Sequence, residues 1–191
     1  MISRNVVEER SKNVVIMDVF SKLAQERILF IDDVIDSELA NGIVSQLIYL
    51  DSINNNEISI YINSPGGTVY DGVAILDVMD LIKSPVKTVC TGSAMSMAAI
   101  ILLYGDTRVS TKRSTIMLHQ MSTLVRGRLS DISIDYKEAK RLENILHEVI
   151  KEKTNIQDID QKLLTDWYIS PKEAKELGII DTVLNGEPLR K

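Results

Sequence analysis

The sequence predicts an α/β fold with a mostly parallel sheet, crossover helices and one long projecting helix. Short apolar runs rich in β-branched residues alternate with stretches of helical periodicity. Each run is followed closely by a turn and a helix, the order found in right-handed strand–helix–strand crossovers. In the C-terminal third, apolar residues recur every three or four positions from Ser130 to Lys153, which predicts a helix roughly 35 Å long.

The individual elements follow from turn residues, capping residues and prolines. We expect strands at Arg27–Ile31, Ile58–Asn63, Val86–Thr91, Arg108–Val109, Thr115–His119 and Ile179–Val183. We expect a helix capped by Ser37, helices at Tyr70–Lys83 and from Ser96 to Gly105, a long helix capped by Ser130 and ending near Lys153, and helices at Asn155–Leu164 and after the capping box Ser170–Glu173. Residues 1–20 are weakly patterned and are expected to form a mobile arm before one domain at 21–191.

Composition excludes several classes of function. The formal net charge of −5 argues against nucleic acid as the main partner. One cysteine, Cys90, excludes an internal disulfide framework, and two histidines with no zinc-binding spacing predict no metal and no cofactor. No apolar stretch approaches the roughly 20 residues that span a bilayer, so we expect no membrane association and a cytoplasmic protein.

Two segments at expected strand ends have residues suited to catalysis. Ser64-Pro-Gly-Gly67 follows one strand, and its glycines would allow backbone N–H groups to face a bound oxyanion, although a plain tight turn is the alternative. Ser96 begins an apolar helix among small residues, an arrangement similar to a nucleophile elbow. Its alternative is a helix-capping serine, a role for which Ser93 competes.

The candidate base and orienting group lie later in the chain. His119 ends a strand, whereas His147 falls on the polar side of the long helix and is expected to be solvated, so His119 is the base candidate for Ser96. Asp166 lies in the apolar stretch 163–169, where a buried carboxylate would need a partner such as His119. A solvated helix-terminal aspartate is the alternative for Asp166.

Together these residues predict acyl transfer to water. His119 would take the proton of Ser96, whose oxygen attacks a carbonyl, while Asp166 fixes the imidazole tautomer. The N–H groups of Gly67 and Met97 would stabilise the oxyanion.

Four separated motifs resemble the ClpP peptidase family in order and content. They are Tyr61-Ile-Asn-Ser-Pro-Gly-Gly67, Gly92-Ser-Ala-Met-Ser-Met97, Met117-Leu-His-Gln120 and Ile169-Ser-Pro-Lys-Glu-Ala174. The resemblance implies the ClpP/crotonase-type fold, with Ser96, His119 and Asp166 as triad and Gly67 and Met97 as oxyanion donors. It further implies substrate-binding residues, namely Gly66, Ser122, Thr123 and Leu124.

The resemblance also implies an architecture and partners. It places a head at 21–121 and 165–191, a handle at 122–164, and axial loops in the N-terminal arm. It implies heptameric rings stacked as a tetradecamer, an AAA+ Clp unfoldase that supplies unfolded polypeptides, and hydrolysis of their peptide bonds inside the barrel.

The sequence departs from the family pattern at three places. Met121 replaces a proline, 122–125 replace a glycine-rich stretch, and Thr165 replaces an arginine that pairs across rings. These changes predict a divergent paralogue working in a mixed barrel with a second ClpP subunit. The alternatives are a ClpP-like scaffold subunit with little activity of its own and a crotonase-type acyl-CoA enzyme.

Overall fold

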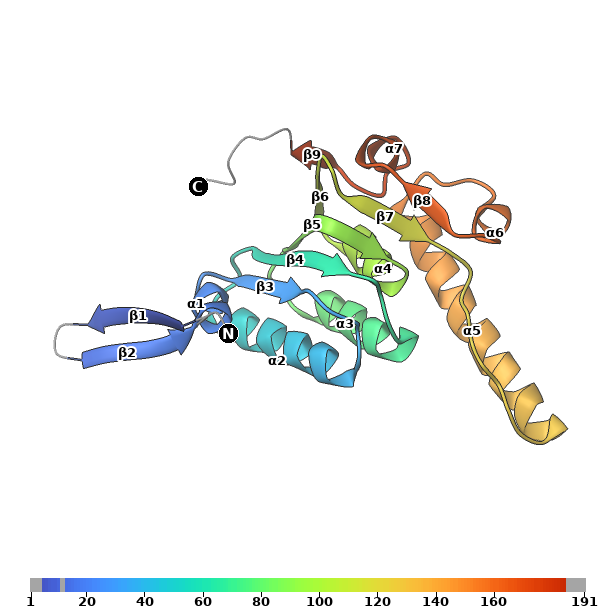
Figure 1. Ribbon diagram of the computed structural model, residues 1–191, viewed down its shortest axis with the longest axis horizontal. Helices are drawn as coiled ribbons and strands as arrows, with labels where there is room; N and C mark the ends of the chain where they lie inside the picture. The colour runs from blue at the N-terminus through green and yellow to red at the C-terminus, as the bar shows by residue number, and fades with distance from the viewer. Residues whose placement is uncertain (1–4, 11–12, 185–191) are drawn as a thin grey trace.

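A mostly parallel sheet organises the chain in the computed structural model, which describes residues 5–10 and 13–184 (Figure 1). The strands follow the order β3-β4-β5-β6-β9, and all of these neighbours pair in parallel. β7 pairs in parallel with β5 and antiparallel with β8, which confirms the predicted α/β fold. The strands are β3 (Ile28–Ile31), β4 (Ile58–Ser64), β5 (Val86–Met95), β6 (Thr107–Thr111), β7 (Thr115–Leu118), β8 (Trp167–Ile169) and β9 (Thr182–Leu184).

Three helices pack together against the sheet and enclose the core. They are α2 (Ser37–Ile53), α3 (Val69–Leu81) and α4 (Met97–Tyr104). In β4 the side chains of Ile58, Ile60 and Ile62 are fully buried and alternate with partly exposed ones, so one face of the strand meets the core. Helix α4 is buried from Met97 to Leu103, and this central position fixes the turn that precedes it.

A long helix, α5 (Leu129–Lys153), projects from the head (Figure 1). Its buried residues, Leu142, Glu143 and Ile150, all belong to the C-terminal half that lies against the head. Tyr70 on α3 donates a hydrogen bond of 2.8 Å to Glu138 and so connects the head to the middle of α5. Within the described residues, no helix is long and apolar enough to cross a membrane.

The N-terminal segment has more regular structure than the sequence predicts. A hairpin of β1 (Asn5–Arg10) and β2 (Asn13–Asp18) is followed by α1 (Val19–Gln25), where an unpatterned arm was expected. Residues 1–4, 11–12 and 185–191 lie outside the described residues, so part of the predicted arm and of the expected axial loop cannot be compared. Among the described residues, β1 and β2 pair only with each other and not with the main sheet, so no buried sheet face imposes an amphipathic pattern on them.

Several predicted helix caps and boundaries differ from the structure. Asp36, rather than Ser37, caps α2 by accepting a hydrogen bond from Leu39 N, and Ser130 lies inside α5. The helix expected at 155–164 shrinks to α6 (Ile159–Lys162). The capping box is confirmed at α7 (Pro171–Glu176), where Ser170 and Glu173 exchange side-chain and backbone hydrogen bonds.

Candidate active site

Ser96 occupies a strained turn between β5 and α4. Its φ of 53° and ψ of −126° lie in a region that residues with a β-carbon rarely adopt. The backbone is held there because Ser96 N donates to Met117 O at 2.8 Å. Gly66 makes the turn possible, since a β-carbon added at Gly66 would lie 2.7 Å from the Ser96 β-carbon. The Ser96 hydroxyl does not cap α4, so it is available for another partner.

This strain leads to a stability prediction. The free energy of unfolding of Ser96→Gly is expected to be about 1 kcal/mol larger than that of Ser96→Ala, so the glycine variant is the more stable one. Glycine adopts positive φ without a steric cost. Both variants lack the hydroxyl, so their difference isolates the backbone conformation, and denaturant unfolding measures it. Ser93, which has negative φ in β5, is the matched control and should show the opposite order. A more stable Ser96→Ala protein would contradict the prediction.

His119 follows β7 directly and contacts Ser96. β7 lies beside β5 in parallel, with Met117 opposite Met95, so both strands deliver the residues after them to the same edge of the sheet. The half-buried His119 ring places Nε2 2.8 Å from Ser96 Oγ. The two residues predicted as nucleophile and base are therefore in contact, at a distance suited to proton transfer.

Asp166 lies beside His119 in the backbone but does not contact it through its side chain. β8 runs antiparallel to β7 with Trp167 opposite Leu118, so the next position along each strand sets Asp166 opposite His119. The Asp166 side chain is exposed, and no hydrogen bond or ion pair joins it to His119 or to any other residue between 13 and 184. The structure thus brings Ser96 and His119 into contact. Asp166 lies beside His119, directly before the neighbouring strand, with its side chain in solvent.

The two predicted oxyanion donors lie at the same place. Gly67 follows β4, and a β-carbon there would lie 2.0 Å from Ile35 O, so only glycine fits. Met97 is the first residue of α4, where N–H groups have no partner within the helix. No acceptor within the described residues takes the N–H of Gly67 or Met97. Gly66 N instead donates to Ser64 Oγ at 3.1 Å, which stabilises the loop.

A cavity of about 80 Å³ opens beside Ser96 and His119. Of the predicted substrate-binding residues, Ser122 lines this cavity, whereas Thr123 and Leu124 are exposed outside it and Gly66 is buried behind the loop. The remaining walls are formed mostly by apolar residues from α3, α4, β7, α5 and the segment after α6. They are Val69, Ile100, Leu118, Met121, Leu146, Ile150 and Leu163, together with the acidic residue Glu143.

Sequence reasoning missed the contribution of α5 to this cavity. Helical periodicity predicts that Leu146 and Ile150 are buried, but it does not say that they line a cavity with Ser96 and His119. Glu143 gave no signal at all, since a glutamate on a long polar helix normally faces water. The packing of α5 against the head, which depends on residues distant in sequence, determines all three positions.

Other reactive side chains lie in settings that do not suit catalysis. His147 was expected to be solvated, and this is wrong: its side chain is 12% exposed, with Nδ1 3.0 Å from Asp160 Oδ1, because α6 packs beside α5. Burial raises the pKa of the Cys90 thiol to about 11, which keeps it protonated and unreactive. Within the described ranges, no three histidine, cysteine or acidic side chains could jointly hold a metal ion.

The chain is similar to known proteins over most of its length. The family model for Clp protease matches residues 10–187. A Deinococcus radiodurans protein named ATP-dependent Clp protease proteolytic subunit is 40% identical over 187 residues, covering 94% of this chain and 91% of the relative. A Bacteroides thetaiotaomicron protein of the same name is 42% identical over 94% of this chain and 84% of its own length. Prochlorococcus marinus has a proteolytic subunit 1 that is 40% identical, with 97% of both chains covered. The chain belongs to the Clp protease family.

Proposed function

We propose that Ser96, His119 and Asp166 are the catalytic triad of this chain, which as a member of the Clp protease family is a serine-type proteolytic subunit. The observation that carries the proposal is the 2.8 Å contact between Ser96 Oγ and His119 Nε2 at the rim of a cavity. A hydroxyl in contact with an imidazole beside two open backbone N–H groups is the arrangement that acyl transfer to water requires.

The reaction proceeds in two halves. His119 removes the proton of Ser96 as the oxygen attacks a peptide carbonyl, and the N–H groups of Gly67 and Met97 receive the developing oxyanion. The imidazolium then protonates the leaving amine, and an acyl-enzyme remains on Ser96. Water, deprotonated by His119, releases the second product. Asp166 stabilises the imidazolium once the loop before β8 turns its carboxylate toward His119.

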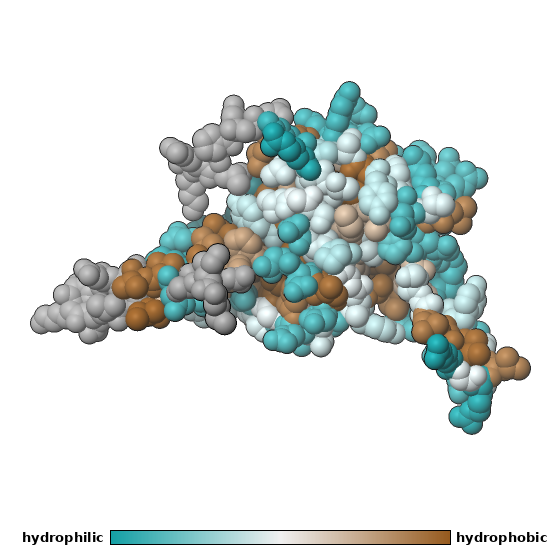
Figure 2. Space-filling model, viewed as in Figure 1, coloured by the Kyte–Doolittle hydropathy of each residue, from teal (hydrophilic) through white to brown (hydrophobic). Residues whose placement is uncertain are grey.

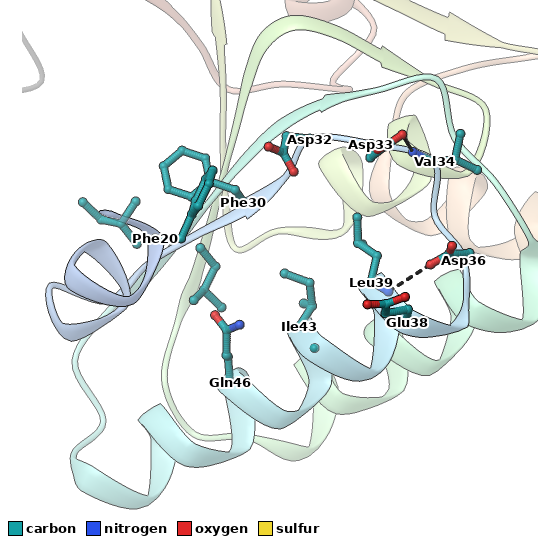
Figure 3. A pocket seen from close by; sticks show the side chains of 13 residues that line it. Phe20, Phe30, Asp32, Asp33, Val34, Asp36, Glu38, Leu39, Ile43 and Gln46 are labelled. Atoms are coloured by element: carbon teal, nitrogen blue, oxygen red, sulfur yellow. Dashed lines mark hydrogen bonds between the residues drawn. The ribbon is translucent and has the colours of Figure 1, made fainter. Parts of the chain in front are cut away.

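The two ends of the sheet support ring assembly by this chain. A closed ring needs two different, complementary surfaces on each subunit. At the β3 end, a cavity of about 490 Å³ has an apolar floor that includes Phe20 and Phe30 and a rim of acidic side chains (Figure 3). Those acidic residues are Asp32, Asp33, Asp36 and Glu38. At the β9 end, a depression beside Val183 is lined by three lysines and one glutamate, Lys112, Lys172, Lys175 and Glu176.

Exposed apolar side chains on α5 support stacking of two rings. They gather at the free end of the helix (lower right of Figure 2), where Leu129 is 86% exposed and Leu124, in the segment before α5, is 80% exposed. Ile134 and Tyr136 continue the apolar surface along the helix. Clustered exposed apolar side chains are typical of a protein interface, so we propose that the α5 helices of two heptameric rings interlock into a tetradecamer.

The remaining parts of the proposal concern partners and location. The relatives are named ATP-dependent, and we propose that an AAA+ Clp unfoldase feeds unfolded polypeptides to this chain in the cytoplasm. Thr165 and the altered segment 122–125 support a mixed barrel with a second ClpP subunit. The division into N-terminal arm, head and handle fits the hairpin, the sheet domain and α5, respectively.

Covalent labelling and sizing test the function together. A small fluorophosphonate is expected to modify Ser96, identified by mass spectrometry, and native mass spectrometry is expected to show particles of seven or fourteen subunits. Binding of CoA thioesters without labelling would favour a crotonase-type enzyme instead. Labelled particles of the chain alone that cleave peptides would remove the need for a second subunit, whereas mixed barrels that keep full turnover with Ser96→Ala would favour a scaffold.

A further inference from the structure

Glu143 is a buried carboxylate in the wall of the catalytic cavity. Its side chain is 8% exposed, and it shares the cavity with Ser96, His119 and the apolar walls already described. Glu143 and Leu163 also line a larger depression of about 480 Å³ on the outer side, so they separate the catalytic cavity from this outer space. The catalytic cavity therefore has one acidic group, Glu143, among apolar walls and the polar side chains of Ser96, His119 and Ser122.

The charge of Glu143 is stabilised from the outer side. Lys140 donates to Glu143 Oε2 at 2.6 Å, and the Gln120 side chain donates a second hydrogen bond. Burial raises the pKa of the Glu143 carboxyl, but the two donors and the Lys140 charge outweigh this, and the pKa lies below its usual value. Glu143 is thus ionised at neutral pH. A carboxylate has about four lone-pair positions, so two donors leave acceptor capacity for a further donor.

The cavity has the size and place of a subsite for one side chain. Its volume of about 80 Å³ is well below the ~300–1,000 Å³ of sites that enclose whole small molecules. It adjoins both Ser96 Oγ and the oxyanion donor Met97. When a peptide carbonyl is attacked by Ser96, the side chain of the residue that carries this carbonyl, the P1 residue, is the group that enters the cavity.

We propose that Glu143 makes this cavity selective for a P1 side chain with an apolar stem and a hydrogen-bond donor at its tip, such as glutamine. The proposal rests on the peptidase function proposed above. The apolar walls contact the stem, and Glu143 accepts a hydrogen bond from the amide at the tip. An apolar P1 side chain of the same length would cover the carboxylate without giving it a donor, which is unfavourable for a buried charge.

A purely positioning role for Glu143 makes a different prediction. Gln120 follows His119 directly, so Glu143 could act by holding the end of β7 through Gln120. In that case its replacement would slow all substrates equally, because His119 serves every P1 residue. Selectivity instead changes the ratio between two substrates.

The test uses two fluorogenic peptides that differ only in P1, glutamine or methionine, which have similar length. The full-length wild type is compared with Glu143→Met and with the isosteric Glu143→Gln. Glu148→Met is the control, because Glu148 is exposed on the same helix and does not line the catalytic cavity. We expect the kcat/KM ratio of glutamine to methionine to fall about ten- to hundredfold in Glu143→Met, less in Glu143→Gln, and not in the control.

Each outcome decides the proposal. The selectivity is overturned if Glu143→Met lowers kcat/KM equally for both peptides and so leaves their ratio unchanged. It is also overturned if the wild type prefers the methionine peptide or cleaves neither peptide, while Ser96 still reacts with a small fluorophosphonate. Failure of that reagent to modify Ser96 in the wild type would instead overturn the peptidase function itself. Circular dichroism and sizing check that each variant is folded. If Glu143→Met does not fold, the kcat/KM ratio of Glu143→Gln decides the proposal.

Discussion

Ser96→Ala is expected to lower the rate of peptide hydrolysis on the order of 10⁴-fold or more. The hydroxyl oxygen forms the new bond to the substrate carbonyl, and no other nucleophile lies against His119 Nε2 within the described residues. Binding and the open N–H groups of Gly67 and Met97 remain, so a small residual rate over the uncatalysed reaction should persist. Initial rates with a fluorogenic peptide, measured at equal concentrations of assembled protein, check this result.

Ser93→Ala is the matched control for that experiment. Ser93 lies three residues earlier in the same segment, and its hydroxyl contacts only Asn63 at 3.4 Å. Loss of this exposed contact should leave activity within about twofold and stability within ~0.5 kcal/mol. Comparable activity losses in both variants would point to general disruption of the β5–α4 turn, and an active Ser96→Ala protein would contradict the proposed nucleophile.

The position of the site could be predicted from sequence because it depends on local patterns. β-branched runs such as 58–62 mark buried strands, and the residues that follow parallel strands must meet at one edge. Ser64-Pro-Gly-Gly67 and Ser96 each follow such a run, so their proximity follows from strand order alone. The contact between Ser96 and His119 requires one further condition, the parallel pairing of β5 and β7, and the structure has this pairing.

The parts that sequence could not predict depend on tertiary contacts. β8 is only three residues long and forms because it pairs with β7. Such a short strand has no alternation of apolar and polar residues from which it could be predicted. Asp36 caps α2 although Ser37 is an equally good capping residue by type, and only the backbone conformation decides between them. The burial of His147 requires α6 to fold back onto α5, a contact between helices whose sequences carry no sign of it.

The cavity depends on the head and on α5 together, which connects assembly with specificity. Leu146 and Ile150 reach the catalytic cavity from the same helix whose free end exposes Leu129. The hydrogen bond from Tyr70 to Glu138 fixes α5 to the head between these two regions. A shift of α5 in an assembly would therefore change the walls of the cavity as well as the proposed contact between rings.

Asp166→Asn is expected to reduce kcat about 10³- to 10⁴-fold, since an amide cannot stabilise the imidazolium and favours the wrong tautomer of His119. The free energy of unfolding should change by no more than ~0.5 kcal/mol, because the side chain is exposed and makes no hydrogen bond or ion pair with residues 13–184. Single-turnover kinetics and denaturant unfolding measure the two quantities.

Asp158→Asn is the control for this substitution. Asp158 is exposed nearby in sequence and adopts a left-handed conformation that asparagine tolerates well, so the same chemical change should leave kcat unaltered. A large loss at Asp166 without a loss of stability requires the carboxylate to reach His119 during catalysis, which the antiparallel pairing of β7 and β8 allows by a local change in the loop before Trp167. If Asp166→Asn keeps kcat within about threefold of the wild type, the conformation with the carboxylate in solvent is the working one, and Ser96 and His119 act as a dyad.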